Sequence, residues 1–247
     1  MSIPLFLAMT ASEFLQDGEK PQNLAWMSAH FSPSDSGLSN LPPALPTGSI
    51  LILDDQITWA DHDMERVCQE LTHVLLRDKA YGLLLDFERE PCEQTLLLAR
   101  AAAQCCREIG CAIAMPEVYR GDGDAACFLP PLPCTVPVDT VNLPRGPIWL
   151  DAAPTGAVAR IGSEDVSITH ADPGELALLA KTHSVFRDPT LGCRYYSYRS
   201  GEEVVVSLFD TPGTVWEKLE QLPIELAIAA WRETAAFETS ELLLAER

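Results

Sequence analysis

The stretch YGLLLDFERE, residues 81–90, sets three leucines directly in front of two spaced carboxylates. A continuous apolar run of this length is typical of a parallel β-strand that is covered on both faces. Because side chains alternate along a strand, Gly82, Leu84, Asp86 and Glu88 share one face. In a closed barrel this face would line the interior. The two carboxylates would then lie at the carboxyl end of the strand, where barrel active sites are built.

Similar apolar runs recur along the 247-residue chain, and several of them end in an acidic residue. The other runs are IPLFLAM (3–9), LAWMSAHF (24–31), SILILDD (49–55), CAIAMPE (111–117), AACFLP (125–130), PIWLDA (147–152) and ELAIAAWRE (225–233). Their apolar character is continuous rather than alternating, which indicates an α/β protein with a parallel sheet.

Two amphipathic patterns with helical spacing separate the central runs. Residues 61–80 place apolar side chains on one face, and Asp61 or Asp63 could cap the start of this helix. Residues 91–110 form the second pattern, with Gly110 in the terminating position. The centre of the chain therefore alternates strand and helix.

Eight apolar runs predict a (β/α)8 TIM-barrel-like fold, provided that residues 225–233 close the ring. The pattern differs at 156–169 and 193–211, where β-rich runs flank Gly-containing polar turns and predict antiparallel hairpins. We therefore expect one domain over residues 1–247, with an α+β insertion at 154–209 after the seventh strand.

The charge of the chain restricts its partners. Seventeen basic residues stand against 36 acidic ones, which gives a net charge of −19. Such a chain repels phosphate backbones and anionic lipid surfaces, so neither nucleic acid nor a membrane is an expected partner.

The cysteines and the amino-terminal run bear on location. Eight cysteines occur without Cys-x-x-Cys spacing, so no structural metal site and no cofactor are predicted. Several lie in helix-like or strand-like runs, which fits small apolar residues in a reducing compartment. The run at 3–9 has no basic segment before it, and we interpret it as a buried strand rather than a signal peptide. We expect a cytoplasmic protein.

The pair Asp86 and Glu88 carries the strongest chemical signal. Residues two apart on one strand face stand roughly 6–7 Å apart at the backbone. Like charges at this separation favour keeping a proton on one of them when the site is partly desolvated. A protonated carboxyl is a general acid of the kind that protonates a leaving glycosidic oxygen. In the alternative interpretation, the two side chains cap the next helix or face water.

The quoted stretch resembles the fourth strand of glycoside hydrolase family 18, the chitinase-like barrels. That strand reads Asp-Gly-x-Asp-x-Asp-x-Glu, and Gly82, Asp86 and Glu88 match it. Tyr81 and Leu84 stand at the other two aspartate positions. The order of elements is also similar, because these barrels often carry an α+β insertion after the seventh strand.

The resemblance implies roles for three residues. Glu88 would be the acid, and Asp86 would accept a hydrogen bond from the N–H of a substrate 2-acetamido group. The carbonyl oxygen of that group would attack the anomeric carbon. Trp231, at the end of the eighth strand, would stack on the sugar. The implied activity is substrate-assisted, retaining hydrolysis of a β-linked N-acetylhexosamine-containing glycan, without a cofactor.

The chain departs from the family pattern at two places, and both departures favour a barrel without catalytic activity. Leu84 replaces an aspartate that supports the next one. The sixth strand of the family usually ends in Met-x-Tyr-Asp, whereas ACFLPPLP at 126–133 offers neither a hydroxyl nor a carboxylate. Tyr119, Tyr196 and Tyr198 are candidates for the missing hydroxyl. The first alternative function is therefore a catalytically inactive barrel that binds a glycan or a partner.

Other polar residues also follow predicted strands. Asp54, Asp55, Glu117 and Asp151 predict an acidic mouth, and we expect Asp54 and Asp151 to contact substrate. Carboxylate oxygens suit Mg²⁺, so the second alternative is a metal-dependent barrel enzyme acting on a small anionic substrate. Singly, each of these residues could instead cap a helix or begin a loop. His30 follows a strand alone, which favours a satisfied polar residue over a catalytic base.

Overall fold

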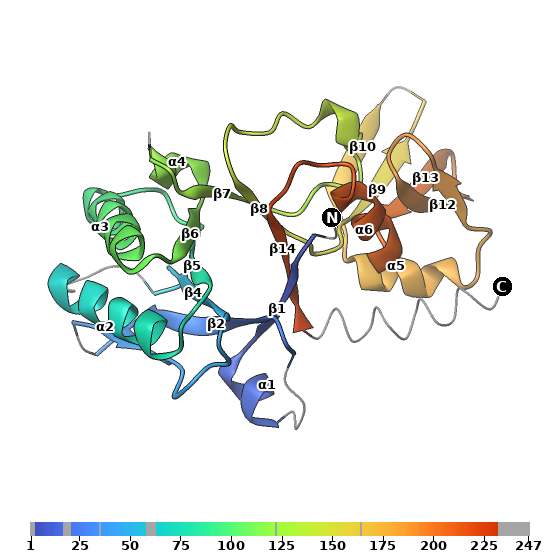
Figure 1. Cartoon of the computed structure of the whole chain (residues 1–247). Helices are drawn as coiled ribbons and strands as arrows, with labels where there is room; N and C mark the ends of the chain where they lie inside the picture. Colours follow the sequence, from blue (N-terminus) through green and yellow to red (C-terminus); the bar gives the residue numbers. More distant parts are fainter. Residues whose placement is uncertain are drawn as a thin grey trace. The chain divides into compact units, whose positions relative to one another are not determined.

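The computed structural model describes residues 3–16, 21–34, 36–57, 63–121, 123–163 and 165–231 (Figure 1). The chain divides into two compact units. The barrel unit comprises residues 1–129, 144–150 and 225–231, and the insert unit comprises residues 130–143 and 151–224. The predicted insertion at 154–209 lies inside the insert unit, which begins earlier and ends later than the prediction.

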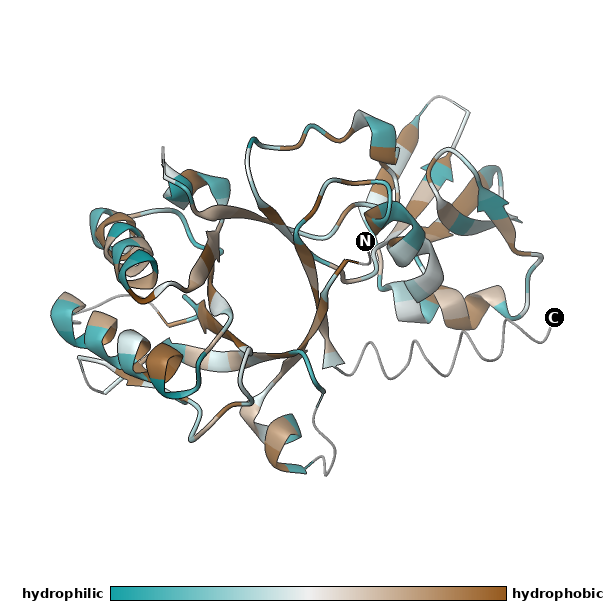
Figure 2. Ribbon diagram, in the orientation of Figure 1, coloured by the Kyte–Doolittle hydropathy of each residue, from teal (hydrophilic) through white to brown (hydrophobic). Residues whose placement is uncertain are grey.

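Eight parallel strands close into a barrel, in agreement with the predicted (β/α)8 fold. They are β1 (Leu5–Met9), β2 (Leu24–Phe31), β4 (Ile50–Asp54), β5 (Gly82–Asp86), β6 (Ala112–Met115), β7 (Ala126–Leu129), β8 (Ile148–Asp151) and β14 (Leu226–Ala230). Strand β1 pairs with both β14 and β2, which closes the ring seen in Figure 2. The short β3 (Leu38–Ser39) pairs antiparallel with β2.

The helices around the barrel differ greatly in length. They are α1 (Ala11–Gln16), α2 (Met64–Arg77), α3 (Glu93–Ile109) and α4 (Glu117–Arg120). Helices α2 and α3 lie side by side against β4, β5 and β6 (Figure 1). Among the described residues, no helix combines the length and the apolar character needed to cross a membrane.

The predicted capping residues stand at the start of α2 and at the end of α3. The Asp63 carboxylate accepts hydrogen bonds from the backbone N–H groups of Glu65 and Arg66 at the start of α2. Asp61, the other predicted cap, lies outside the described residues. Helix α3 ends at Gly110, whose φ of 73° is a left-handed conformation that glycine adopts without a steric penalty.

Two apolar layers fill the two sides of the barrel wall. The interior layer consists of strand side chains, namely Phe6, Ala8, Ala25, Ile50, Ile52, Leu84, Ala114, Ala126, Trp149, Leu226 and Ile228. The helix-side layer joins the opposite strand faces, including Leu83 and Leu85, to buried residues of α2 and α3. Because β5 is covered on both faces, its continuous run of leucines is explained.

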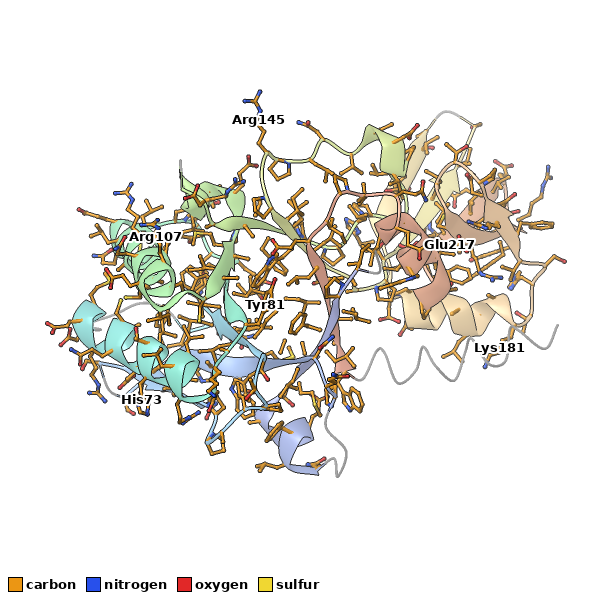
Figure 3. All side chains as sticks on the ribbon, in the orientation of Figure 1. His73, Tyr81, Arg107, Arg145, Lys181 and Glu217 are labelled. Carbon is orange, nitrogen blue, oxygen red and sulfur yellow. The ribbon has the colours of Figure 1, made fainter. Side chains whose placement is uncertain are left out.

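Aromatic rings close the amino end of the barrel. Tyr81 is labelled in Figure 3. Its ring centroid lies 5.5 Å from that of Phe6 and 6.0 Å from that of Trp149. The Tyr81 hydroxyl donates a hydrogen bond to Glu225 Oε1 at 3.1 Å. Burial and the Glu225 carboxylate together raise the pKa of Tyr81 to about 12. Aromatic packing and the Tyr81–Glu225 hydrogen bond therefore occupy this end of the barrel.

The insert unit is built on a five-stranded antiparallel sheet. In spatial order its strands are β10 (Val166–His170), β9 (Gly156–Ile161), β13 (Glu203–Phe209), β12 (Cys193–Ser200) and β11 (Phe186–Asp188). Both predicted hairpins are formed, by β9 with β10 and by β12 with β13. The unit also contains η1 (Val138–Thr140), α5 (Pro173–Ala180) and α6 (Pro212–Leu219). Leu176 and Ala180 of α5 form a core with Tyr196 and Phe209.

Candidate active site at the carboxyl end of the barrel

Three ionisable side chains stand in register across neighbouring strands. His30 of β2 pairs with Asp54 of β4, and Asp54 pairs with Asp86 of β5. Asp54 and Asp86 lie two residues beyond Ile52 and Leu84, which belong to the interior layer. Since side chains alternate along a strand, both carboxylates face the interior at the barrel mouth. We call His30, Asp54 and Asp86 the mouth row.

A β-bulge brings His30 into the mouth row. Pairing between β2 and β4 shifts by one residue between Trp26 and Ala29. Ala25 belongs to the interior layer, whereas Ala29 and Phe31 belong to the helix-side layer. Strict alternation from Ala25 would have put His30 on the helix side, so the extra residue re-aims its side chain inward. His30 Nε2 also lies 3.5 Å from Asn40 Nδ2.

The surroundings of Asp54 shift the pKa of its carboxyl. Its Oδ1 accepts a hydrogen bond from the Gln56 backbone N–H at 3.0 Å. Burial raises the pKa of the Asp54 carboxyl above its ordinary value, and the neighbouring Asp55 carboxylate acts in the same direction. The Gln56 hydrogen bond and the charge of His30 oppose this increase. Asp54 therefore holds its proton more strongly than a solvated aspartic acid does.

The loop that carries Glu88 is tied down by the next residue after β4. Asp55 is only 4% exposed. Its Oδ1 accepts from the Glu88 N–H and its Oδ2 from the Arg89 N–H, both at 3.0 Å. The Glu88 side chain is exposed beyond this anchored backbone. Asp55 thus determines where the candidate acid stands, without facing the mouth itself.

Tyr119 supports the same loop from the helix side. The residue is 4% exposed and belongs to the helix-side layer. Its hydroxyl donates a hydrogen bond to the Arg89 carbonyl oxygen at 3.1 Å, and its ring meets Phe87 edge-on with centroids 5.3 Å apart. Burial raises the pKa of the Tyr119 hydroxyl. The structure therefore places Tyr119, expected at the substrate, against the backbone behind the mouth.

The remaining predicted site residues come from other elements. Trp231, at the end of β14, is partly buried and packs against the helix-side layer. Asp151 ends β8, two residues beyond Trp149 of the interior layer, and its Oδ1 accepts a hydrogen bond from the Ala153 N–H at 2.9 Å. Tyr196 and Tyr198 lie on β12 of the insert unit, and Tyr196 is buried. Glu117 is exposed on α4.

Two further features bear on the site. Within the described ranges, no group of three or more His, Cys, Asp or Glu side chains is placed to hold a metal ion.

A cavity of about 730 Å³ lies between α3 and strands β6 and β7, lined in part by Arg100, Arg107 and Arg120. It arises where only the four-residue α4 follows β6. No member of the mouth row lines it, so we place the candidate chemistry at the strand ends on geometric grounds.

A closed parallel barrel with ionisable residues at its carboxyl end is the architecture of TIM-barrel enzymes. The solved structures that this fold resembles include chitinases, a spore cortex-lytic enzyme and a putative glycosylase. A GH18 chitinase from Cycas revoluta, in complex with (GlcNAc)3, has a TM-score of 0.54 at 10% identity and covers 93% of this chain and 95% of its own. The spore cortex-lytic enzyme SleL of Bacillus megaterium has a TM-score of 0.54 at 12% identity, covering 93% of this chain and 70% of its own.

A third structure, the putative sporulation-specific glycosylase ydhD of Bacillus subtilis, has a TM-score of 0.54 at 8% identity and covers 85% of this chain and 91% of its own. No protein-family model matches the chain, and no curated protein matches it in sequence. At such low identities the likeness establishes the fold, which is that of the GH18 glycoside hydrolases. Activity must be argued from the site.

Proposed function

We propose that the chain hydrolyses a β-linked N-acetylhexosamine-containing glycan at the mouth of the barrel, with Glu88 as the acid and Asp86 as its partner. The observation that carries this proposal is the anchored Glu88 loop beside Asp86, at the carboxyl end of β5. A carboxylic acid held on a fixed backbone is what protonation of a leaving oxygen requires. The fold shared with GH18 chitinases supports the same class of substrate.

In this proposal the two carboxylates divide the work. Glu88 protonates the glycosidic oxygen as the bond to the leaving sugar breaks. Asp86 accepts the N–H of the 2-acetamido group and orients its carbonyl oxygen toward the anomeric carbon, so that the substrate supplies the nucleophile. Trp231, at the end of β14, packs against the helix-side layer but is partly exposed, and we assign its exposed part to stacking on the sugar ring.

One observation favours glycan binding without turnover as the second candidate. Glu88 is exposed, so it remains hydrated when no ligand is present. Burial is one of the main causes that keep a catalytic carboxyl protonated near neutral pH. A chain that binds the glycan but does not desolvate Glu88 would bind without cleaving.

The experiment is hydrolysis of a chromogenic N,N′-diacetylchitobioside across a range from about pH 4 to pH 8. Wild type should turn over, and Glu88→Gln should lose at least about 100-fold in kcat, since general acid catalysis contributes 10²- to 10⁴-fold. The matched control is Glu90→Gln, which removes an exposed carboxylate two residues along the same loop. It should keep activity within about twofold.

Each of the other outcomes has a definite meaning. Turnover that survives in Glu88→Gln would refute the acid assignment. A folded wild type that binds the sugar without any turnover would establish the second candidate instead. Equal losses in Glu88→Gln and Glu90→Gln would show that the charge of the loop, rather than proton transfer by Glu88, sets the rate.

A further inference from the structure

The cavity beside α3 lies where the chain connects β6 to β7 with a very short helix. Helix α4, of four residues, stands between these two strands in the chain (Figure 1). A (β/α)8 barrel ordinarily follows each strand with a full helix on the outer face. Ile113 and Met115 of β6, which belong to the helix-side layer, form part of the cavity lining. The cavity therefore occupies space that a longer helix would fill.

Helix α3 supplies the opposite wall. Leu96, Ala99, Ala103 and Arg107 follow one another at helical spacing and line the cavity together with Arg100. The two alanines are short, which leaves room between the helix and the strands. Arg100 and Arg107 are exposed and stand two turns apart, about 10 Å along the helix axis. Two guanidinium groups thus stand on an otherwise apolar wall.

Arg120, at the end of α4, supplies a third guanidinium group. A Cβ atom at position 146 would lie 2.6 Å from Arg120 Nη2, so the missing side chain of Gly146 gives this group its place. Burial and the Glu117 carboxylate raise the pKa of the Cys127 thiol, whereas Arg120 lowers it. Arg120 Nε is buried and has no hydrogen-bond partner among the described residues. A buried donor in this state costs free energy that a bound acceptor would recover.

The acidic groups of the lining leave these arginines available. They are Asp124, which is exposed, and Glu225, which accepts a hydrogen bond from the Tyr81 hydroxyl at 3.1 Å. Arg107 Nη1 donates to Gln104 Oε1 at 2.5 Å. In the part of the chain that the structure describes, none of the three arginines forms an ion pair. A chain with 36 acidic and 17 basic residues thus has a cavity whose lining is more basic than acidic.

We propose that this cavity binds a small organic anion, a carboxylate or phosphate ester on an apolar body, with Arg120 as its main donor and Arg100 and Arg107 assisting from α3. A planar guanidinium group matches the paired oxygens of either anion. The apolar body would lie against the lining residues Ile113 and Met115. The volume of about 730 Å³ is within the range of small-molecule pockets, roughly 300–1,000 Å³. This inference does not depend on the proposed hydrolysis.

The test follows the methionine methyl groups by ¹H–¹³C NMR, without any glycan. The probes are 2-naphthoate, 2-naphthyl phosphate and the neutral 2-naphthalenemethanol, which share one apolar body. At least one anion should shift the Met115 signal, which Met115→Leu identifies, and the neutral alcohol should bind at least about tenfold more weakly. Met27, on β2, is the internal reference and should not shift. The tighter of the two anions identifies the head group as carboxylate or phosphate.

Three variants locate the binding. Arg120→Gln should weaken the tighter anion at least about tenfold, because hydrogen bonds to charged groups are the strong ones. Arg199→Gln is the matched control: it removes the same charge from an exposed position on β12 and should stay within about twofold. Ala103→Leu fills the cavity without a change of charge and should also abolish binding, which keeps the test decisive if Arg120→Gln does not fold.

Three results would overturn the proposal. One is a Met115 signal that no probe shifts. Another is a neutral alcohol that binds as tightly as the anions, because the cavity would then be an apolar hollow without anion recognition. The third is an equal loss of affinity in Arg199→Gln and Arg120→Gln, which would assign binding to the general charge of the protein.

Discussion

The buried Asp55 carboxylate positions the loop that carries Glu88, although Asp55 itself does not face the barrel mouth. Its two oxygens each accept one backbone N–H of the Glu88 loop. Hydrogen bonds to a charged acceptor are stronger than neutral ones, and a buried donor left without an acceptor costs the free energy of its desolvation. The position of Glu88 therefore depends on a residue from the neighbouring strand, 33 positions earlier in the chain.

Asp55→Asn should lower the free energy of unfolding by about 1.5–3 kcal/mol. The amide keeps one acceptor oxygen but turns its NH2 group toward a backbone N–H, so one donor is left unsatisfied. Urea unfolding followed by circular dichroism measures the loss. Glu90→Gln, which changes an exposed carboxylate of the same loop, should stay within about 0.5 kcal/mol of wild type. Equal stabilities for the two variants would contradict the anchoring role.

At the scale of elements, the junction of β13 and α6 is joined by a buried ion pair. Lys218 Nζ on α6 lies 2.6 Å from Asp210 Oδ1, and both side chains are at most 2% exposed. Asp210 also accepts hydrogen bonds from the Thr155 hydroxyl at 2.9 Å and the Thr214 hydroxyl at 3.3 Å. These bonds satisfy the carboxylate, so the pair holds the strand end, the helix and the loop before β9 together.

Removing one partner of this pair should cost far more than removing both. Lys218→Met leaves the Asp210 charge buried without its cation, and we expect a loss of about 3–5 kcal/mol. The double variant Lys218→Met with Asp210→Asn removes the stranded charge and should recover part of that loss. A double-mutant cycle by urea unfolding measures the coupling. Additive losses would show that the pair contributes no interaction of its own.

At the scale of the whole chain, the dominant property is its charge. A net charge of −19 on 247 residues means that the folded state carries self-repulsion, which salt screens. The Debye length falls from about 30 Å at 0.01 M to about 10 Å at 0.1 M ionic strength. Repulsion between distant carboxylates therefore weakens over this range, while short buried pairs such as Asp210 and Lys218 are affected less.

The Tm should rise with sodium chloride over that range. Each 1 kcal/mol of relieved repulsion would raise the Tm by roughly 2–4 °C for a chain of this size. Differential scanning fluorimetry at constant pH measures the shift. A variant with Gln at the exposed positions Glu90, Glu117 and Glu202 carries three fewer charges and should respond less to salt. A Tm that is independent of salt in both proteins would show that repulsion does not limit stability.

Local patterns were sufficient for the strands of the barrel and for the end at which its carboxylates lie. A strand covered on both faces must be apolar throughout, so eight continuous runs predicted eight parallel strands. Alternation along β5 placed Asp86 on the interior side with Leu84, because successive side chains of a strand point to opposite faces of the sheet. Both hairpins of the insert unit follow from Gly-containing turns between β-rich runs.

The partners of those carboxylates depended on the tertiary structure. Simple alternation along β2 would turn His30 away from Asp54, and only the bulge between Trp26 and Ala29 brings it inward. Asp55 and Tyr119 looked like mouth residues, yet both hold the Glu88 loop from behind. For Asp55 and Tyr119 the reason is that the backbone groups of Glu88 and Arg89 that they bind lie at least 30 positions away in the chain. For His30 the reason is a change of register. The direction of a side chain follows from alternation along its own strand unless the pairing register changes. In β2 the register with β4 changes, and the sequence of β2 alone does not contain that information.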